Sequence, residues 1–180
     1  MPNELPTQPL SDAVREGILG STEGEWIVTT NADNRLAALS LIKQTQRSLF
    51  ICSRTLDTPI YDDVEIVAEI SRVARRSRFS DIRILVQNSG PIVKTGHHLV
   101  ELAYQLPSLV HIRTHGEEFQ GFNEAFLVAD HTGIIYRRNA ERFEGIVMFH
   151  AGGKAGELVK QFEAIWNKSS PDPNLRRLSL

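Results

Sequence analysis

The sequence predicts an α/β protein: a layered, mixed β-sheet flanked by helices on both faces. Three observations predict this fold class. Short apolar runs of strand length alternate with helical patterns up to residue 113, which is the order typical of parallel strands. The chain then changes to a hairpin pattern around the turn Asp130-His131-Thr132-Gly133, followed by one more apolar run. The most amphipathic stretch, residues 155–166, comes last and predicts a closing helix.

Each element follows from a local pattern. Apolar runs predict strands, and apolar residues at i, i+3, i+4 and i+7 predict helices. Ser11 is expected to cap the first helix, Asn31 or Asp33 the second, and Pro107 ends the helix before it. The expected order is a short helix at 11–19, a strand at 26–28, a helix through Leu36, Leu39 and Ile42, a strand at 49–52, a helix at 62–76, a strand at 82–86, a helix through Leu99 and Leu106, and strands at 109–113, 125–130, 134–137 and 146–149.

The chain divides into three parts on composition. Residues 1–24 form a polar leader, residues 25–168 an α/β domain, and residues 169–180 a tail with two prolines. The formal net charge of −2 disfavours a polycationic nucleic-acid binder, which usually shows a concentrated positive footprint. With neither a signal-peptide pattern nor an apolar run near the ~20 residues of a membrane helix, we expect a cytoplasmic protein.

A search for chemical motifs finds none complete. The single cysteine, Cys52, lies in an apolar run and is expected to be a small buried residue. His97 and His98 are adjacent on a predicted helix and point about 100° apart, so they are poorly placed to hold one ion. Arg54 follows a predicted strand, where α/β proteins bind ligands, and is a candidate anion contact; a salt bridge to Asp57 or Asp62 is the alternative. No metal and no cofactor are expected.

The densest basic cluster has two interpretations. Arg72, Arg75, Arg76 and Arg78 lie at the end of the helix predicted at 62–76, and acidic residues occupy its first turns. This polarity complements the helix macrodipole, which favours a solvated helix end over a phosphate-binding patch.

Residues 123–130 resemble the strand that carries the H-x-K-x-x-x-x-D signature of the phospholipase D superfamily. Asn123 stands at the position of the His, Ala125 at that of the Lys, and Asp130 is retained. The order of the flanking elements over residues 25–168 also resembles one half of that family's architecture. The chain further resembles bacterial proteins of unknown function with a phospholipase D-like domain, whose tails look like residues 170–178.

The resemblance implies a phospholipase D-like half-unit that has lost its chemistry. In the family the His attacks phosphorus and the Lys neutralises phosphate oxygens, and an Asn and an Ala do neither. Arg137-Arg138 replaces the family's downstream Gly-Ser. One expectation is a cleft that still binds a phosphate or a carboxylate without cleaving it. The equal alternative is that these residues are ordinary polar residues of strand ends and loops. The candidate ligand-binding residues are Arg54, Asn123, Asp130, Arg137, Arg138 and Arg142.

The functional hypotheses therefore belong to different classes. The first is a pseudoenzyme that binds an anionic ligand or a protein partner, with no membrane contact. Because the family's active form has two halves, a homodimer is expected. The second is a divergent phosphodiesterase or nuclease with a replaced nucleophile, for which His97 and His98, and further His115 and His150, are the candidate bases; one should lie near Asp130 and Arg137. The third is a non-catalytic nucleic-acid-binding module that uses residues 72–78 and 137–142.

Overall fold

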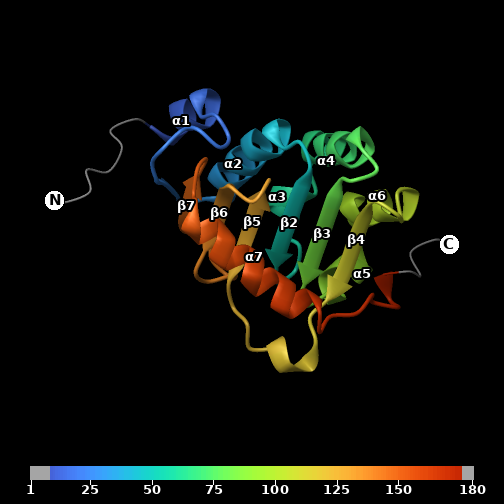
Figure 1. The fold of residues 1–180 in the computed structure, drawn as a ribbon. Coiled ribbons are helices and arrows are strands. Elements are labelled where there is room, and N and C mark those ends of the chain that lie inside the picture. The colour runs from blue at the N-terminus through green and yellow to red at the C-terminus, as the bar shows by residue number, and fades with distance from the viewer. Residues whose placement is uncertain (1–8, 176–180) are drawn as a thin grey trace.

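The fold is built on one mixed β-sheet. The computed structural model describes residues 9–175 (Figure 1). Within them the strand order is β1-β7-β6-β5-β2-β3-β4; β2, β3 and β4 are parallel, and each remaining neighbouring pair is antiparallel. The strands are β1 (Trp26–Val28), β2 (Ser48–Ser53), β3 (Asp81–Val86), β4 (Val110–Thr114), β5 (Ala125–Ala129), β6 (Gly133–Arg137) and β7 (Gly145–Met148).

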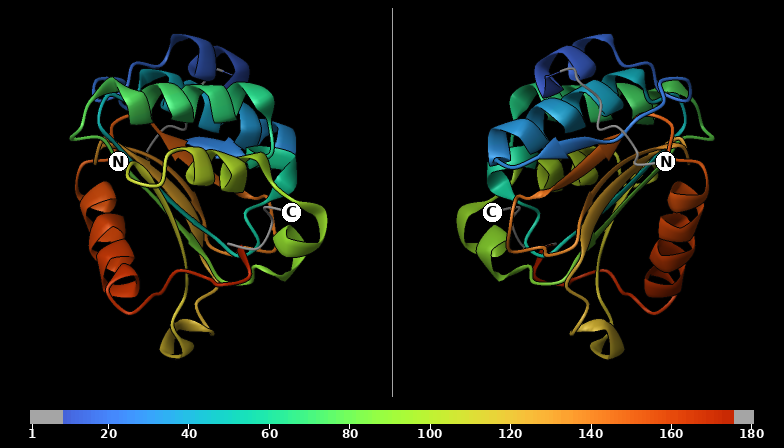
Figure 2. Two further views of the ribbon diagram at one scale, coloured as in Figure 1. Left: turned by 90° about the vertical axis from the view of Figure 1, so that its right-hand side faces the viewer. Right: turned by 90° about the vertical axis from the view of Figure 1, so that its left-hand side faces the viewer.

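Helices cover both faces of this sheet, which confirms the predicted fold class. Figure 2 shows α7 on one face, and α1, α2, α4 and α6 on the other. The loop that carries η1 projects beyond the edge of the sheet in the same views. The helices are α1 (Leu10–Glu16), α2 (Asn31–Gln44), α3 (Thr58–Tyr61), α4 (Val64–Arg76), α5 (Gly90–Thr95), α6 (His98–Gln105), η1 (Glu117–Phe119) and α7 (Gly153–Trp166).

Two hydrophobic cores follow from the alternation of side chains along β2, whose six residues are all buried. Leu49 and Ile51 face the core under α2 and α4, whereas Phe50 and Cys52 face the core under α7. Phe50 stacks on Phe162 of α7 with ring centroids 4.9 Å apart. A strand buried on both faces is therefore the central element, and Cys52 is a buried residue as predicted.

Arg83 fastens α7 to the sheet. Its guanidinium lies 4.4 Å from the Phe50 ring centroid and ion-pairs with Asp81 at 2.8 Å and with Glu163 of α7 at 2.7 Å. Because the guanidinium is planar, it stacks on the aromatic ring while its edge nitrogens meet both carboxylates.

The helix caps differ from the sequence prediction. Thr30 caps α2, with its side chain accepting from the Asp33 backbone N–H, and the Asp33 carboxylate accepts from the Thr30 backbone N–H at 3.0 Å. Asp33 is thus the third helical residue of a capping box, and neither Asn31 nor Asp33 is the cap. Ser11 does not cap α1, which follows Pro9 and ends before Ile18.

Both segments set apart by composition contact the sheet or its helices. Ala13 is 2% exposed, and Leu19 packs so closely that a Cβ on Gly133 would lie 2.3 Å from its methyl group. At the other end, Ser170 bridges Thr114 of β4, and Leu175 is buried in the core. The predictions for residues 1–8 and 176–180 lie outside the described part of the chain. Among residues 9–175, no helix has the length and apolarity needed to cross a bilayer.

Candidate functional site

Most of the candidate residues gather at one edge of the sheet. The carboxyl end of β2 precedes Arg54, β5 begins just after Asn123, and β6 ends at Arg137. The register pairs Cys52 with Phe126 and Ala125 with Arg137, so these strand ends lie side by side. Arg138 and Arg142 follow in the β6–β7 connection. The sheet therefore brings five of the six predicted residues to a common edge, which we call the β2 carboxyl edge.

Asp130 lies at the opposite edge, which corrects the expectation that it shares a cleft with Asn123. The whole of β5 separates the two residues, and seven residues of extended chain span about 23 Å. The Asp130 carboxylate accepts hydrogen bonds from the backbone N–H groups of Gln46, Arg47 and Ser48 at 2.7–2.9 Å. This retained acid therefore fixes the start of β2 and has no contact with the β2 carboxyl edge.

Arg137 is buried in an ion pair. Its guanidinium bonds to the Asp57 carboxylate, and the two side chains are 4% and 11% exposed. The Asp57 carboxylate also accepts from the Ser53 hydroxyl at 3.0 Å, and Arg137 donates to the Arg142 carbonyl at 3.1 Å. Every charge at this point is thus compensated by the protein itself.

The position of this pair is informative because Arg137 lies directly across from Ala125. Opposite residues of antiparallel strands have Cβ atoms about 5 Å apart on the same face. A small side chain at position 125 leaves that space to Arg137. A cation therefore stands next to the position where the resembling family has its Lys, but it comes from the neighbouring strand and is neutralised.

The remaining polar residues of this edge are more exposed. Arg54 ion-pairs with Glu141 at 2.5 Å. The sequence had suggested Asp57 or Asp62 as its partner, and neither is. The Asn123 amide donates to the Asn139 side chain at 3.3 Å. Arg138 and Arg142 are exposed, and within residues 9–175 their guanidinium groups form no salt bridge.

His97 has a structural role. Its Nε2 lies 3.0 Å from the Leu56 carbonyl, and its Nδ1 accepts from the Leu99 backbone N–H at 3.2 Å, which makes it the N-cap of α6. The sequence predicted that His97 and His98 lie next to each other within a helix. In the structure α6 begins at His98, and His97 precedes it. The Nδ1 acceptor and the Nε2 donor define a neutral ring, and burial lowers its pKa.

The other three histidines that could replace the nucleophile also have local partners. His98 bonds to Asp62 at 2.7 Å, and this hydrogen bond raises its pKa. His115 is buried 3.8 Å from the Cys52 sulfur, and burial lowers its pKa. His150 lies 3.1 Å from Glu23. In the described part of the chain, none of the four histidines bonds to Asp130 or Arg137.

Sequence reasoning named Asp57 only as a salt-bridge partner of Arg54, and it missed Ser53. The available signal was their position, because both lie at the end of β2 beside Arg54. Their partner Arg137 is 80 positions away, and only the strand pairing brings the residues together.

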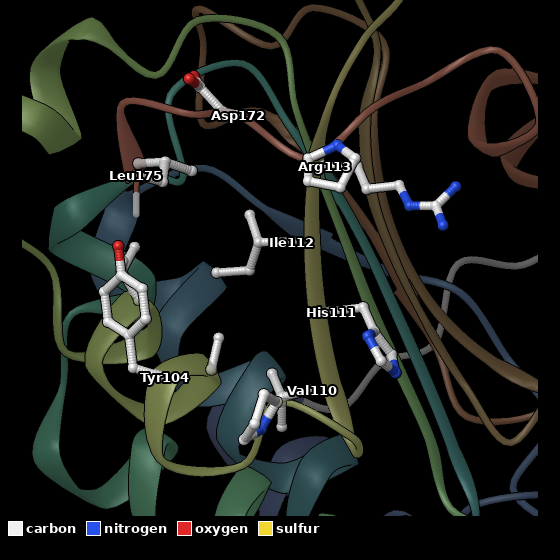
Figure 3. A pocket seen from close by; sticks show the side chains of 11 residues that line it. Tyr104, Val110, His111, Ile112, Arg113, Asp172 and Leu175 are labelled. Carbon is white, nitrogen blue, oxygen red and sulfur yellow. The ribbon is translucent and has the colours of Figure 1, made fainter. Parts of the chain in front are cut away.

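A cavity adjoins the β4 edge of the sheet. It measures about 430 Å³ and lies between α6, β4 and the segment after α7. Figure 3 shows Tyr104, Ile112 and Leu175 around the cavity, with the Arg113 guanidinium directed away from it. This cavity contains none of the residues predicted from the sequence.

The comparisons with known proteins support the fold. A family model described as "Domain of unknown function (DUF7931)" matches residues 30–178. No curated protein matches the chain. Nuc from Salmonella typhimurium, a phospholipase D family member, is 14% identical with a TM-score of 0.58, and the match covers 83% of this chain and 97% of that one. NucT from Helicobacter pylori is 12% identical with a TM-score of 0.61, covering 82% and 98%.

A third similar structure is that of a chromatin protein. TrmBL2, an archaeal chromatin protein described with a novel mode of DNA binding, is 14% identical with a TM-score of 0.60. The match covers 91% of this chain, which spans only 60% of the TrmBL2 chain. At these identities the comparisons establish a phospholipase D-like fold.

Proposed function

We propose that this chain, which belongs to the DUF7931 family of domains of unknown function, is a phospholipase D-like module that binds a ligand and does not hydrolyse phosphodiesters. The observation that carries the proposal is the buried Arg137–Asp57 ion pair. It occupies the side of the sheet next to Ala125, where the resemblance would place a free lysine.

The chemistry of this edge supports a non-catalytic role. An amide such as that of Asn123 has no nucleophilic lone pair of useful basicity, so it cannot form a phosphoenzyme. Arg137 is 3% exposed and already neutralised, so it would have to leave Asp57 to stabilise a transition state. No histidine of the described chain is within bonding distance of this pair to replace the missing nucleophile.

The direct test is hydrolysis of bis-p-nitrophenyl phosphate by the purified protein. We expect no release of p-nitrophenol above buffer. Asn123→Ala is the variant of the candidate position, and Arg138→Gln, an exposed residue of the same edge, is its matched control. Hydrolysis by the parent chain that is lost in Asn123→Ala would overturn the proposal in favour of a divergent phosphodiesterase.

The exposed polar residues of the β2 carboxyl edge are the proposed ligand contacts. Arg138 and Arg142 have no carboxylate partner among residues 9–175, and Arg54 and Asn123 lie beside them. Two guanidinium groups suffice to bind a phosphate or carboxylate through charge-assisted hydrogen bonds. Calorimetric titration with pyrophosphate should detect binding that Arg138→Gln/Arg142→Gln abolishes, and equal binding by that variant would remove these residues from the proposal.

Two further parts of the proposal concern the whole protein. A homodimer would supply a second half-unit, since this chain corresponds to nearly the full length of Nuc and NucT and carries one strand of the H-x-K-x-x-x-x-D type. A cytoplasmic location rests on the sequence alone. The DNA binding in the TrmBL2 description gives a reason to search the remaining surface for nucleic-acid contacts.

A further inference from the structure

Phe79 is the aromatic side chain left most open to solvent at the amino end of the parallel strands. It is 60% exposed, whereas the rings of Phe50, Phe126 and Phe162 are buried between the sheet and α7. At this exposure the ring stays largely in contact with water after folding. Its exposed surface is therefore available for stacking against a partner.

Four exposed arginines lie beside this ring or on the helix that precedes it. The Arg78 guanidinium lies 4.7 Å from the Phe79 ring centroid. Arg75 and Arg76 are exposed in the last turn of α4, and Arg47 lines the same hollow as Phe79. Among residues 9–175 none of these four arginines forms a salt bridge, in contrast to Arg72, which pairs with Glu69 and bonds to carbonyls at the end of α2. The helix macrodipole favours cations here, but it requires neither Arg47 nor an exposed ring.

The hollow beside Phe79 has the size and the polarity for a nucleobase. Its volume is about 510 Å³, and Arg47, Ser48, Asp81, Asp130 and His131 complete its lining. The Asp81 and Asp130 carboxylates are already held by Arg83 and by the backbone of β2. They repel a phosphate from the hollow itself, yet their remaining lone pairs can accept from the amino and imino groups of a base.

We propose that this surface, formed by Arg47, Arg75, Arg76, Arg78 and Phe79, binds single-stranded nucleic acid. A base stacks on Phe79, and the phosphates on either side meet the arginines. Stacking on an aromatic ring requires an unstacked base, which a duplex does not offer. The carboxylates in the hollow disfavour an anionic membrane as the partner, because lipid phosphates would meet them. The surface lies at the sheet edge opposite to Arg137, so the inference does not depend on the proposed lack of catalysis.

The test is fluorescence anisotropy with a labelled oligothymidylate of about 20 nucleotides at about 50 mM salt. We expect saturable binding. The logarithm of the association constant should fall linearly with the logarithm of the salt concentration, with a slope near −3, because about four phosphates are contacted. Phe79→Ala should weaken binding at least about fivefold, since one stacked base is lost. Because the ring is exposed, this variant should fold normally.

A charge-matched pair of variants makes the test specific. Arg75→Gln/Arg76→Gln should weaken binding and make the salt dependence shallower, with a slope smaller in magnitude by about 1.4. Lys94→Gln/Lys160→Gln removes the same charge at exposed positions of α5 and α7, outside both proposed binding surfaces, and should bind like the parent chain. Equal weakening in both variants would mean diffuse electrostatic attraction and would overturn the proposed surface.

Three other outcomes would also overturn it: no binding at low salt, binding unchanged by Phe79→Ala, or equal binding of a duplex.

Vesicles containing phosphatidylserine provide the remaining comparison. Their binding by the parent chain, lost in Phe79→Ala while the oligonucleotide fails to bind, would assign the surface to a membrane. Cleavage of the oligonucleotide would instead contradict the proposed function and leave the binding surface intact.

Discussion

Asp130 is the one residue of the H-x-K-x-x-x-x-D pattern that this chain retains, and its contacts give it a structural role. Its carboxylate accepts three backbone N–H groups at the start of β2. Asp130 and His131 both adopt positive φ angles of 47° and 57° in the turn between β5 and β6. Aspartate and asparagine tolerate this left-handed conformation better than most residues.

Asp130→Asn should therefore destabilise the fold without straining the turn. The amide keeps one acceptor oxygen and turns its NH2 group toward a backbone donor, so we expect a loss of about 1–2 kcal/mol in the free energy of unfolding. Urea titration checks this value. His131→Asn, in the same turn, keeps the conformation and should change stability by less than about 0.5 kcal/mol. Equal losses in both variants would assign the effect to the turn and not to the carboxylate.

Arg137 neutralises the buried carboxylate of Asp57, so replacing Arg137 should be costly. Arg137→Met keeps the length of the side chain but leaves Asp57 buried and unpaired, so stability should fall by about 3–5 kcal/mol. Arg137→Met/Asp57→Asn should recover part of this loss. The exposed neighbour provides the control, because Arg138→Met should have an effect within about 0.5 kcal/mol. A small effect of Arg137→Met in thermal unfolding would show that the pair is solvated.

His97 gives the fold a dependence on pH. Burial lowers its pKa in the folded state, so the unfolded chain binds more protons near and below the ordinary value of about 6.5. Stability should therefore be full above about pH 7 and fall as the pH drops through that ordinary value. His97→Gln keeps a donor for Leu56 and should reduce the fall between about pH 7.5 and pH 5, measured as the urea midpoint. His98 has the opposite sign, because its raised pKa favours the folded state at low pH.

At the scale of the elements, periodicity predicted all seven strands and the longer helices, with ends within a few residues. It missed α3 and α5, since four and six residues show too little of a 3.6-residue repeat. It placed the cap of α2 one or more residues late because Thr30, Asn31 and Asp33 are all good capping residues, and the reciprocal bonds of the capping box decide between them.

The candidate site was predicted in part for a related reason. Strand ends that share an edge follow from strand order, so Arg54, Asn123 and Arg137 were found. The separation of Asp130 from Asn123 also follows from strand length, although closeness in sequence suggested the reverse. The Arg137–Asp57 pair is set by tertiary packing across 80 positions, which no local pattern contains.

Gly17 tests how firmly α1 is attached. A Cβ at this position would lie 2.5 Å from the Phe149 ring and 2.6 Å from the Ala13 carbonyl. Gly17→Ala should therefore destabilise the fold by about 1–3 kcal/mol. Gly156→Ala makes the matched control, because this exposed glycine of α7 has open space around it and alanine favours a helix by up to about 1 kcal/mol. Differential scanning calorimetry should show melting temperatures that move in opposite directions.

At the scale of the whole molecule, the proposed homodimer is the most direct prediction. Light scattering coupled to gel filtration should give about twice the 20.2 kDa of one chain. Arg138→Glu/Arg142→Glu offers a probe of the interface, because a two-fold axis near the β2 carboxyl edge would bring these groups close to their copies. A monomer across about 1–100 μM protein would contradict the dimer.

The two end segments of the described chain contact the sheet near opposite edges, and this sets the length of a connector that could join them within one unit. Gly20 bonds to Phe149 just beyond β7, and Ser170 bridges the free edge of β4. Five strand spacings separate these places in the sheet order, about 24 Å. A circularly permuted chain that joined Ser170 directly to Gly20 would therefore need a connector of about seven extended residues across the sheet.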